Sequence, residues 1–288
     1  MRITHQSSTE SVIRYLRQQT WDILKTQERI SSGKKINQPS DDPQGIRQIL
    51  DTRQILSSLD QFQRNITQAD LRMNALETTL ATVDELITTA QDIVVSAEHA
   101  PELTTTMADQ VARIRDQVIQ LANTRLGDAY VFAGHNTATA PFLDDGTYTG
   151  DGGAYRVRVG EASEVSLQVD GDTVFKTTED IFAILENLET GLRNGDAALV
   201  QNQAASLASF DAHLQTVRAD IGFAMNQMEI SSNYLDTFRL KMENYLTDLE
   251  AADLTEAAVD LQIQNTVYEA ALAAAADLLQ TNLLQFLR

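Results

Sequence analysis

The sequence contains no cysteine, which excludes disulfides, thiol nucleophiles and cysteine-bound metals. Proline and glycine are scarce, at 4 and 13 of 288 residues, and this scarcity argues against general disorder. Basic residues are outnumbered by acidic ones, 22 to 41, so a surface for nucleic-acid phosphates is not expected. No apolar run approaches the roughly 20 residues of a membrane-spanning helix. Neither nucleic acid nor a membrane is therefore an expected partner.

Signals of chemistry and of processing are also missing. The four histidines are scattered, and none stands in a spacing typical of a metal site or a catalytic base. The acidic turns at residues 144–146 and 151–153 fail the EF-hand pattern, because Tyr155 stands where a glutamate is needed. The first eleven residues lack the apolar core of a cleaved secretory signal. The sequence predicts no enzyme, no catalytic residue, no cofactor and no metal.

What the sequence does contain is long apolar seams at helical spacing. Steps of four and three residues predict helices that bury one face along their whole length. One seam comprises Phe62, Ile66, Ala69, Met73, Leu76, Leu80, Val83, Ile87, Ala90, Val94 and Ala97. A second comprises Leu207, Phe210, Leu214, Val217, Ile221, Ala224, Met228, Ser231, Leu235, Phe238, Met242, Tyr245, Leu249 and Ala252. These seams predict two long helices, one from each half of the chain.

The two ends of the chain carry seams of the same kind. The expected terminal helix seam comprises Val12, Leu16 and Ile23 near one end and Leu254, Leu261, Tyr268, Leu272, Leu279 and Phe286 near the other. Residues 1–40 contain seven basic and three acidic side chains, whereas residues 250–288 contain one basic and six acidic side chains. Opposite charges favour pairing of the two ends, within one chain or between neighbours.

The helical pattern is interrupted in three places. Gly33, Pro39 and Pro43 break it near the first end, and Asp42 with Pro43 predicts the start of the next helix. A two-residue slip of the seam at residues 250–253 predicts a joint opposite that break. Residues 135–178 alternate polar and apolar positions between turns, and Asp170-Gly171 predicts a hairpin turn, so a small β insertion is expected.

The predicted fold is therefore mainly α. It is an elongated antiparallel helical bundle or coiled coil, built from both chain halves, with a small β-rich insertion in the middle. Three domains are expected. Residues 1–40 and 254–288 form a pair of terminal helices, residues 41–134 and 179–253 form a helical rod, and residues 135–178 form the insertion.

One segment narrows this prediction. The segment runs Arg29-Ile30-Ser31-Ser32-Gly33-Lys34-Lys35-Ile36-Asn37 and is followed by Asp41-Asp42-Pro43. It resembles the N-terminal signature of the bacterial flagellin superfamily, and residues 280–288 are similar to the C-terminal counterpart. Residues 1–4 and 121–142 resemble the subunits that join hook to filament more than flagellin itself. The candidate assembly motif comprises Arg29, Ile30, Ser31, Ser32, Gly33, Ile36, Asn37, Asp41, Asp42 and Pro43.

The resemblance implies a structural subunit of the bacterial flagellum. The chain would form a homo-oligomeric ring in a tubular assembly at the junction between hook and filament. Its implied partners are hook-associated protein 1, flagellin and a flagellar export chaperone. It would be exported by the flagellar type III route without a cleaved signal peptide, so its implied location is the extracellular flagellum.

Two alternatives stay open. The chain could be a short flagellin that forms the filament itself. A cytoplasmic coiled-coil scaffold would also explain the seams, but it gives no reason for the motif at residues 29–43 or for the β insertion.

Overall fold

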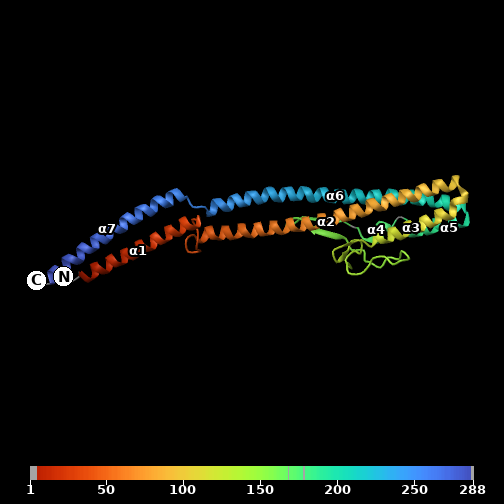
Figure 1. The fold of residues 1–288 in the computed structure, drawn as a ribbon. Helices are drawn as coiled ribbons and strands as arrows, with labels where there is room; N and C mark the ends of the chain where they lie inside the picture. The colour runs from red at the N-terminus through yellow and green to blue at the C-terminus, as the bar shows by residue number, and fades with distance from the viewer. Residues whose placement is uncertain (1–4, 168, 178, 287–288) are drawn as a thin grey trace. The chain divides into compact units, whose positions relative to one another are not determined.

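The computed structural model describes residues 5–167, 169–177 and 179–286, and Figure 1 shows its ribbon. The long helices are α1 (His5–Ser32), α2 (Pro43–His99), α3 (Thr104–Ala122), α5 (Ile181–Asn194), α6 (Ala197–Glu250) and α7 (Leu254–Phe286). The shorter elements are η1 (Pro101–Leu103), β1 (Arg125–Leu126), β2 (Ala129–Tyr130), β3 (Tyr155–Arg158), β4 (Glu164–Leu167) and α4 (Gly171–Phe175). The prediction of a mainly α chain with a small β-rich insertion is confirmed.

The chain divides into two units by its internal contacts. The first unit comprises Met1–Ser58 and Phe238–Arg288, and the second comprises Leu59–Thr237. Helices α2 and α6 each contribute to both units. The expected division into three domains, with boundaries at residues 40 and 253, stays a prediction beside this one. Among the described residues, no helix combines the length and apolar character that crossing a membrane requires.

The core of the second unit follows the predicted seams. On α2, Met73, Leu76, Leu80, Val83 and Ile87 are buried, as the steps of four and three residues predict. On α6, Leu207, Phe210 and Leu214 are buried at the same spacing. Burying each of these side chains contributes roughly 1.5–3 kcal/mol before the cost of ordering the chain. The seams therefore supply the main stabilisation of this unit.

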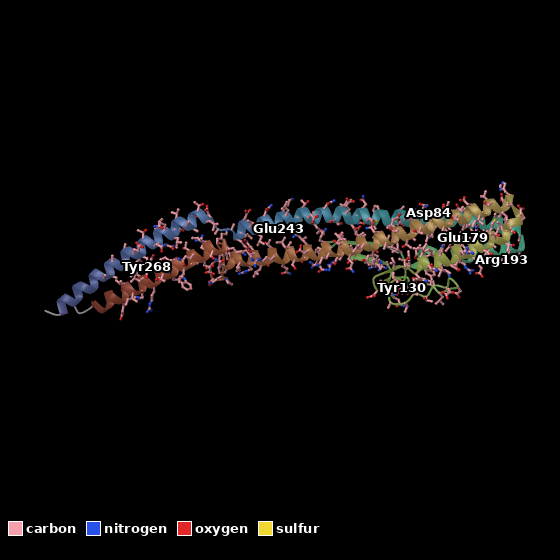
Figure 2. The ribbon with its side chains drawn as sticks, in the orientation of Figure 1. Asp84, Tyr130, Glu179, Arg193, Glu243 and Tyr268 are labelled. Atoms are coloured by element: carbon pink, nitrogen blue, oxygen red, sulfur yellow. The ribbon has the colours of Figure 1, made fainter. Side chains whose placement is uncertain are left out.

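Polar contacts fix the direction and register of α2 and α6 in the second unit. The Gln63 side-chain amide donates to Ser232 Oγ at 2.7 Å. Arg218 forms two salt bridges: its Nη2 lies 2.6 Å from Glu77 Oε1, and its Nη1 lies 3.0 Å from Asp84 Oδ2. Residue numbers fall along α6 as they rise along α2, so these two helix segments are antiparallel. Asp84 is labelled in Figure 2.

The insertion is held by an aromatic cluster more than by its strands. Strands β3 and β4 pair antiparallel, with Val157 opposite Val165. The rings of Phe132, Phe142, Phe175 and Phe182 have neighbouring centroids 5.1–6.0 Å apart, in T-shaped and tilted arrangements. Such pairs stabilise beyond simple burial. This cluster fastens the insertion to the start of α5, which contains Phe182.

The predicted hairpin at Asp170-Gly171 is wrong. Asp170 instead begins α4, because its carboxylate accepts hydrogen bonds from the Thr173 N–H at 3.0 Å and the Thr173 hydroxyl at 2.8 Å. An Asp-Gly pair suits a tight turn, but aspartate is equally a preferred helix N-cap. Burial of Val174 and Phe175 in the aromatic cluster favours the helix.

Candidate functional site

Helices α1 and α7 pack against each other within the first unit, as the terminal seams predict (Figure 1). Val12, Leu16 and Ile23 are partly buried on α1, and Leu261 and Tyr268 are partly buried on α7. Tyr268, labelled in Figure 2, lines the same groove as Leu16. The structure therefore brings these five predicted seam residues to one helix pair.

The face of α7 that meets α1 is rotated from the expected one. Leu254 and Leu272 are 51% and 42% exposed, so they lie largely outside the contact. Among the residues of α7 whose side chains are described, Ala257 is the most buried, at 1% exposure. The side chains of the last two predicted seam residues, Leu279 and Phe286, lie outside the described residues. Residues 1–4, which carry part of the resemblance, also lie outside them.

At the base of this pair, α1 ends where the sequence motif requires a special backbone conformation. Gly33 has a φ of +69°, in the left-handed region that glycine adopts readily. Its N–H donates to the Arg29 carbonyl at 3.0 Å. The Lys34 N–H then donates to Ser32 Oγ at 3.2 Å, which turns the chain away from the helix axis.

The break between α6 and α7 lies directly against this turn. The Lys35 N–H donates to the Glu250 carbonyl at 2.7 Å, and the Ala252 N–H donates to the Gly33 carbonyl at 3.0 Å. These two bonds form a short antiparallel bridge between Lys34 and Ala251. The seam slip at residues 250–253 is therefore a real break, and it faces the motif as predicted. We call residues 33–45 together with residues 248–253 the joint.

Glu250 is the charged centre of the joint. Its carboxylate lies 2.6 Å from Lys34 Nζ and 2.6 Å from Arg53 Nη2, while its side chain is only 11% exposed. Lys35 Nζ adds a hydrogen bond to the Asp248 carbonyl at 2.9 Å. Burial alone would raise the pKa of Glu250, but the hydrogen bonds from Lys34 and Arg53 outweigh it, and the pKa is lowered.

A second carboxylate organises the loop that follows α1. Asp41 forms a salt bridge with Lys25 at 2.9 Å. It also accepts hydrogen bonds from the N–H groups of Asn37 and Gln38 at 3.2 and 3.0 Å. The Lys25 hydrogen bond is the largest cause that lowers the pKa of Asp41. Asn37 also donates from its side chain to the Lys34 carbonyl at 3.4 Å. The loop is thus tied to both α1 and the bridge.

The start of α2 closes the joint. Asp42 Oδ1 accepts the Gln44 N–H at 3.0 Å, and Pro43 occupies the first helical position, as predicted. Gly45 is buried, and a side chain there would lie 2.5 Å from both Asp42 Oδ2 and Ile36 Cδ1. Ile36, itself 7% exposed, therefore packs directly over the α2 backbone.

Most of the predicted motif takes part in this arrangement, but not all of it. Ser31 is exposed, and Ile30 is only partly buried. The Arg29 carbonyl accepts a hydrogen bond from the Gly33 N–H. The buried Nε of Arg29 has no hydrogen-bond partner among the described residues.

The sequence prediction missed three charged residues of the joint, Lys34, Lys35 and Glu250, and also Arg53 of α2, which pairs with Glu250. Lys34 and Lys35 stand inside the motif and could have been included. Arg53 and Glu250 are 197 positions apart, and only the pairing of both chain halves brings them together.

The contacts in the joint are structural, because they hold the ends of four helices together. The point where α1 and α6 end and α2 and α7 begin is held by one backbone bridge, by the ion pairs of Asp41 and Glu250, and by the buried Ile36. The described residues contain no group of three histidine, aspartate or glutamate side chains placed to hold a metal ion.

Two models of known protein families match the regions of the chain that contain the joint. The N-terminal helical region of bacterial flagellin matches residues 3–137, and the C-terminal helical region of bacterial flagellin matches residues 200–287. Together these matches include the joint from both sides and cover well over half of the chain. The chain belongs to the bacterial flagellin family. Its joint and terminal helices lie within the two matched regions.

Individual members of the flagellin family point to one branch of it. Flagellar hook-associated protein 3 of Escherichia coli is 24% identical to the chain over an alignment 314 positions long, which covers 99% of each sequence. A flagellar hook-associated protein of Vibrio parahaemolyticus has a similar fold, with a TM-score of 0.67 and 18% identity, over 73% of this chain and 100% of that one. The flagellar junction protein FlgL of Legionella pneumophila has a TM-score of 0.59 and 16% identity, over 70% and 99% of the two chains. The two solved structures support the fold.

Proposed function

We propose that this chain is a structural subunit of the bacterial flagellum that forms the junction between hook and filament. The observation that carries the proposal is the joint, in which segments from both flagellin-like regions meet at the base of a paired α1 and α7. The alignment with E. coli hook-associated protein 3 along almost the whole chain favours the junction over the filament.

The proposed assembly is a ring of identical copies. Hook-associated protein 1 lies on its hook side and flagellin on its filament side. Copies leave the cell through the flagellar export apparatus as unfolded chains, guided by an export chaperone that binds the C-terminal part. The absence of cysteine suits such a route, since no disulfide has to form or be reduced on the way.

The decisive experiment locates the protein on flagella of the motile bacterium that encodes it. Immunogold labelling should give one short band at the hook–filament boundary. Deletion of the gene should leave hooks without filaments and release flagellin into the medium. Label along the whole filament would identify a flagellin instead, and label confined to the cytoplasm would support a scaffold.

A further inference from the structure

Within the second unit, only Gly195 and Asp196 connect α5 to α6. Helix α5 ends at Asn194, and Gly195 follows with a φ of +67°, in the left-handed region. Asn194-Gly195 is the only asparagine–glycine pair in the sequence. In such a pair, the glycine has no side chain to keep its backbone nitrogen away from the preceding asparagine side chain. We call residues 194–196 the α5–α6 corner.

The surroundings of the α5–α6 corner leave this pair free to move. Asn194 is exposed, and its side-chain amide makes no hydrogen bond with any residue that the structure describes. Apart from chain neighbours, no heavy atom lies within 4 Å of the place where a Cβ of Gly195 would stand. Gly195 also lines a cavity of about 350 Å³, together with Leu192 and Val200. The peptide between Asn194 and Gly195 therefore has room to turn.

The backbone of the corner is held only by the last turn of α5. The Gly195 N–H is shared between the carbonyls of Gly191 and Leu192, and the bond to Leu192 is long, at 3.4 Å. The Asp196 N–H donates to the Gly191 carbonyl at 2.9 Å. Shared bonds of this kind are common at helix ends, and local opening costs the least free energy there. Opening of this turn, without unfolding of the second unit, frees the Gly195 nitrogen.

We propose that Asn194 is a site of spontaneous modification, at which water converts its side chain to aspartate and isoaspartate. The Gly195 backbone nitrogen attacks Asn194 Cγ and forms a new C–N bond. The side-chain nitrogen leaves as ammonia and takes the proton that the Gly195 nitrogen gives up. Water then opens the cyclic imide. Cleavage of the bond to Cγ gives aspartate, and cleavage of the bond to the main-chain carbonyl carbon gives isoaspartate. The reaction needs only water, so it proceeds whether or not the chain joins a flagellum.

Either product weakens the α5–α6 corner. A carboxylate at position 194 stands at the C-terminal end of α5, where the helix dipole is negative. Arg193, labelled in Figure 2, already pairs with Asp109 at 2.7 Å and with Glu189 at 3.0 Å, so its charge is engaged elsewhere. Isoaspartate also lengthens the main chain of this short connection by one carbon. The converted fraction should therefore rise with the age of the chain and loosen the corner.

The test is incubation of the folded full-length chain in mildly alkaline buffer, followed by mass spectrometry of its peptides. Trypsin leaves Asn194 and Asn187 in separate peptides, residues 194–218 and 177–193. Asn187 is the matched control, because it is exposed on the same helix but precedes Leu188 instead of a glycine. The mass gain expected for replacement of NH₂ by OH should appear at Asn194 at least tenfold faster than at Asn187.

Fragment spectra locate the change and identify its products. They should assign the mass gain to Asn194 rather than to Asn202 of the same peptide, and they should show isoaspartate as well as aspartate. Asn194→Gln should abolish the fast conversion, because the longer side chain closes a ring far more slowly. Three results would each overturn the proposal: conversion at Asn194 no faster than at Asn187, aspartate without isoaspartate, or conversion only after unfolding in urea.

The effect on the corner is measured separately. Asn194→Asp carries the charge of the product, and Asn194→Gln is the uncharged control. Hydrogen exchange at the Gly195 and Asp196 amides should be about fivefold faster in the aspartate variant, once intrinsic rates are removed. Exchange at the buried Leu80 of α2 should be the same in both variants. Equal exchange at the corner would overturn the proposed weakening.

Discussion

The effect of a glycine in this chain depends on the backbone conformation that it adopts. Gly33 is in the left-handed region with a φ of +69°, and no heavy atom lies within 4 Å of the place of its missing Cβ. Gly222 also has no neighbour within 4 Å of that place, but it stands inside α6 with an ordinary helical backbone. The two sites differ in conformation and not in available space.

Replacing each glycine by alanine should therefore have opposite effects. Gly33→Ala should lower the free energy of unfolding by about 1–2 kcal/mol, because alanine is strained in the left-handed conformation. Gly222→Ala should raise it by roughly 0.5–1 kcal/mol, because alanine has the higher helix propensity and the smaller loss of backbone entropy. Urea unfolding of the two single variants measures both changes. Equal effects of the two variants would contradict this account of the α1 terminus.

Glu250 should make the joint sensitive to acid. Its pKa is lowered in the fold from an ordinary value of 4.5, so its stabilising contribution is complete above that value. The contribution is lost as the pH falls through the lowered value. Asp41 and Asp253 shift in the same direction and add to the slope.

Glu250→Gln isolates the share of this residue. At neutral pH the variant should lose about 1 kcal/mol, seen as roughly fivefold faster hydrogen exchange at the Lys35 and Ala252 amides. Between pH 6 and pH 3, exchange at these amides should depend less on pH in the variant than in the parent, once intrinsic rates are removed. An unchanged pH dependence would show that Glu250 does not titrate with the joint.

Single helices of this chain are largely predictable from its sequence. Long seams such as Met73 to Ile87 fixed both the existence and the buried face of α2, because α2 has only one strongly apolar side over this stretch. The slip of the seam located the break before α7, and Asp42 with Pro43 located the start of α2.

Other features depend on information that a local pattern does not contain. Helix α7 is apolar around most of its circumference, so heptad spacing could not choose between Leu254 and Ala257 as the face toward α1. The salt bridge of Arg53 with Glu250 depends on pairing across 197 positions. The role of Asp170 was decided by the aromatic cluster around Phe175, which forms only in the folded insertion.

The beginning of α7 depends on one cap. Asp253 Oδ1 accepts the N–H groups of Thr255 and Glu256 at 2.8 and 3.1 Å, and these bonds lower the pKa of Asp253. Asp253→Ala should therefore destabilise the first turn of α7. Faster hydrogen exchange at residues 255–258 measures it. Asp253→Asn, which keeps an acceptor, should exchange nearly as slowly as the parent.

At the scale of the whole molecule, the two units carry different tasks. The second unit contains the buried seams of α2 and α6 and the cluster of the insertion, so it has its own core. The first unit contains the joint and the terminal pair, where large apolar side chains such as Trp21 and Ile263 remain exposed. Stability should therefore reside mainly in the second unit, and assembly mainly in the first.

Truncation after Ala252 tests this division. The variant lacks α7 and the residues on either side of it, but it keeps every residue of the second unit. It should remain a helical monomer whose main thermal transition lies within a few degrees of the parent, because the core of the second unit is intact. It should no longer enter the flagellum, because it lacks α7, which packs against α1 in the parent. Circular dichroism and analytical ultracentrifugation measure the first part, and immunogold labelling of flagella measures the second. Incorporation of the truncated chain at the hook–filament boundary would mean that α7 is not required for the chain to enter the flagellum.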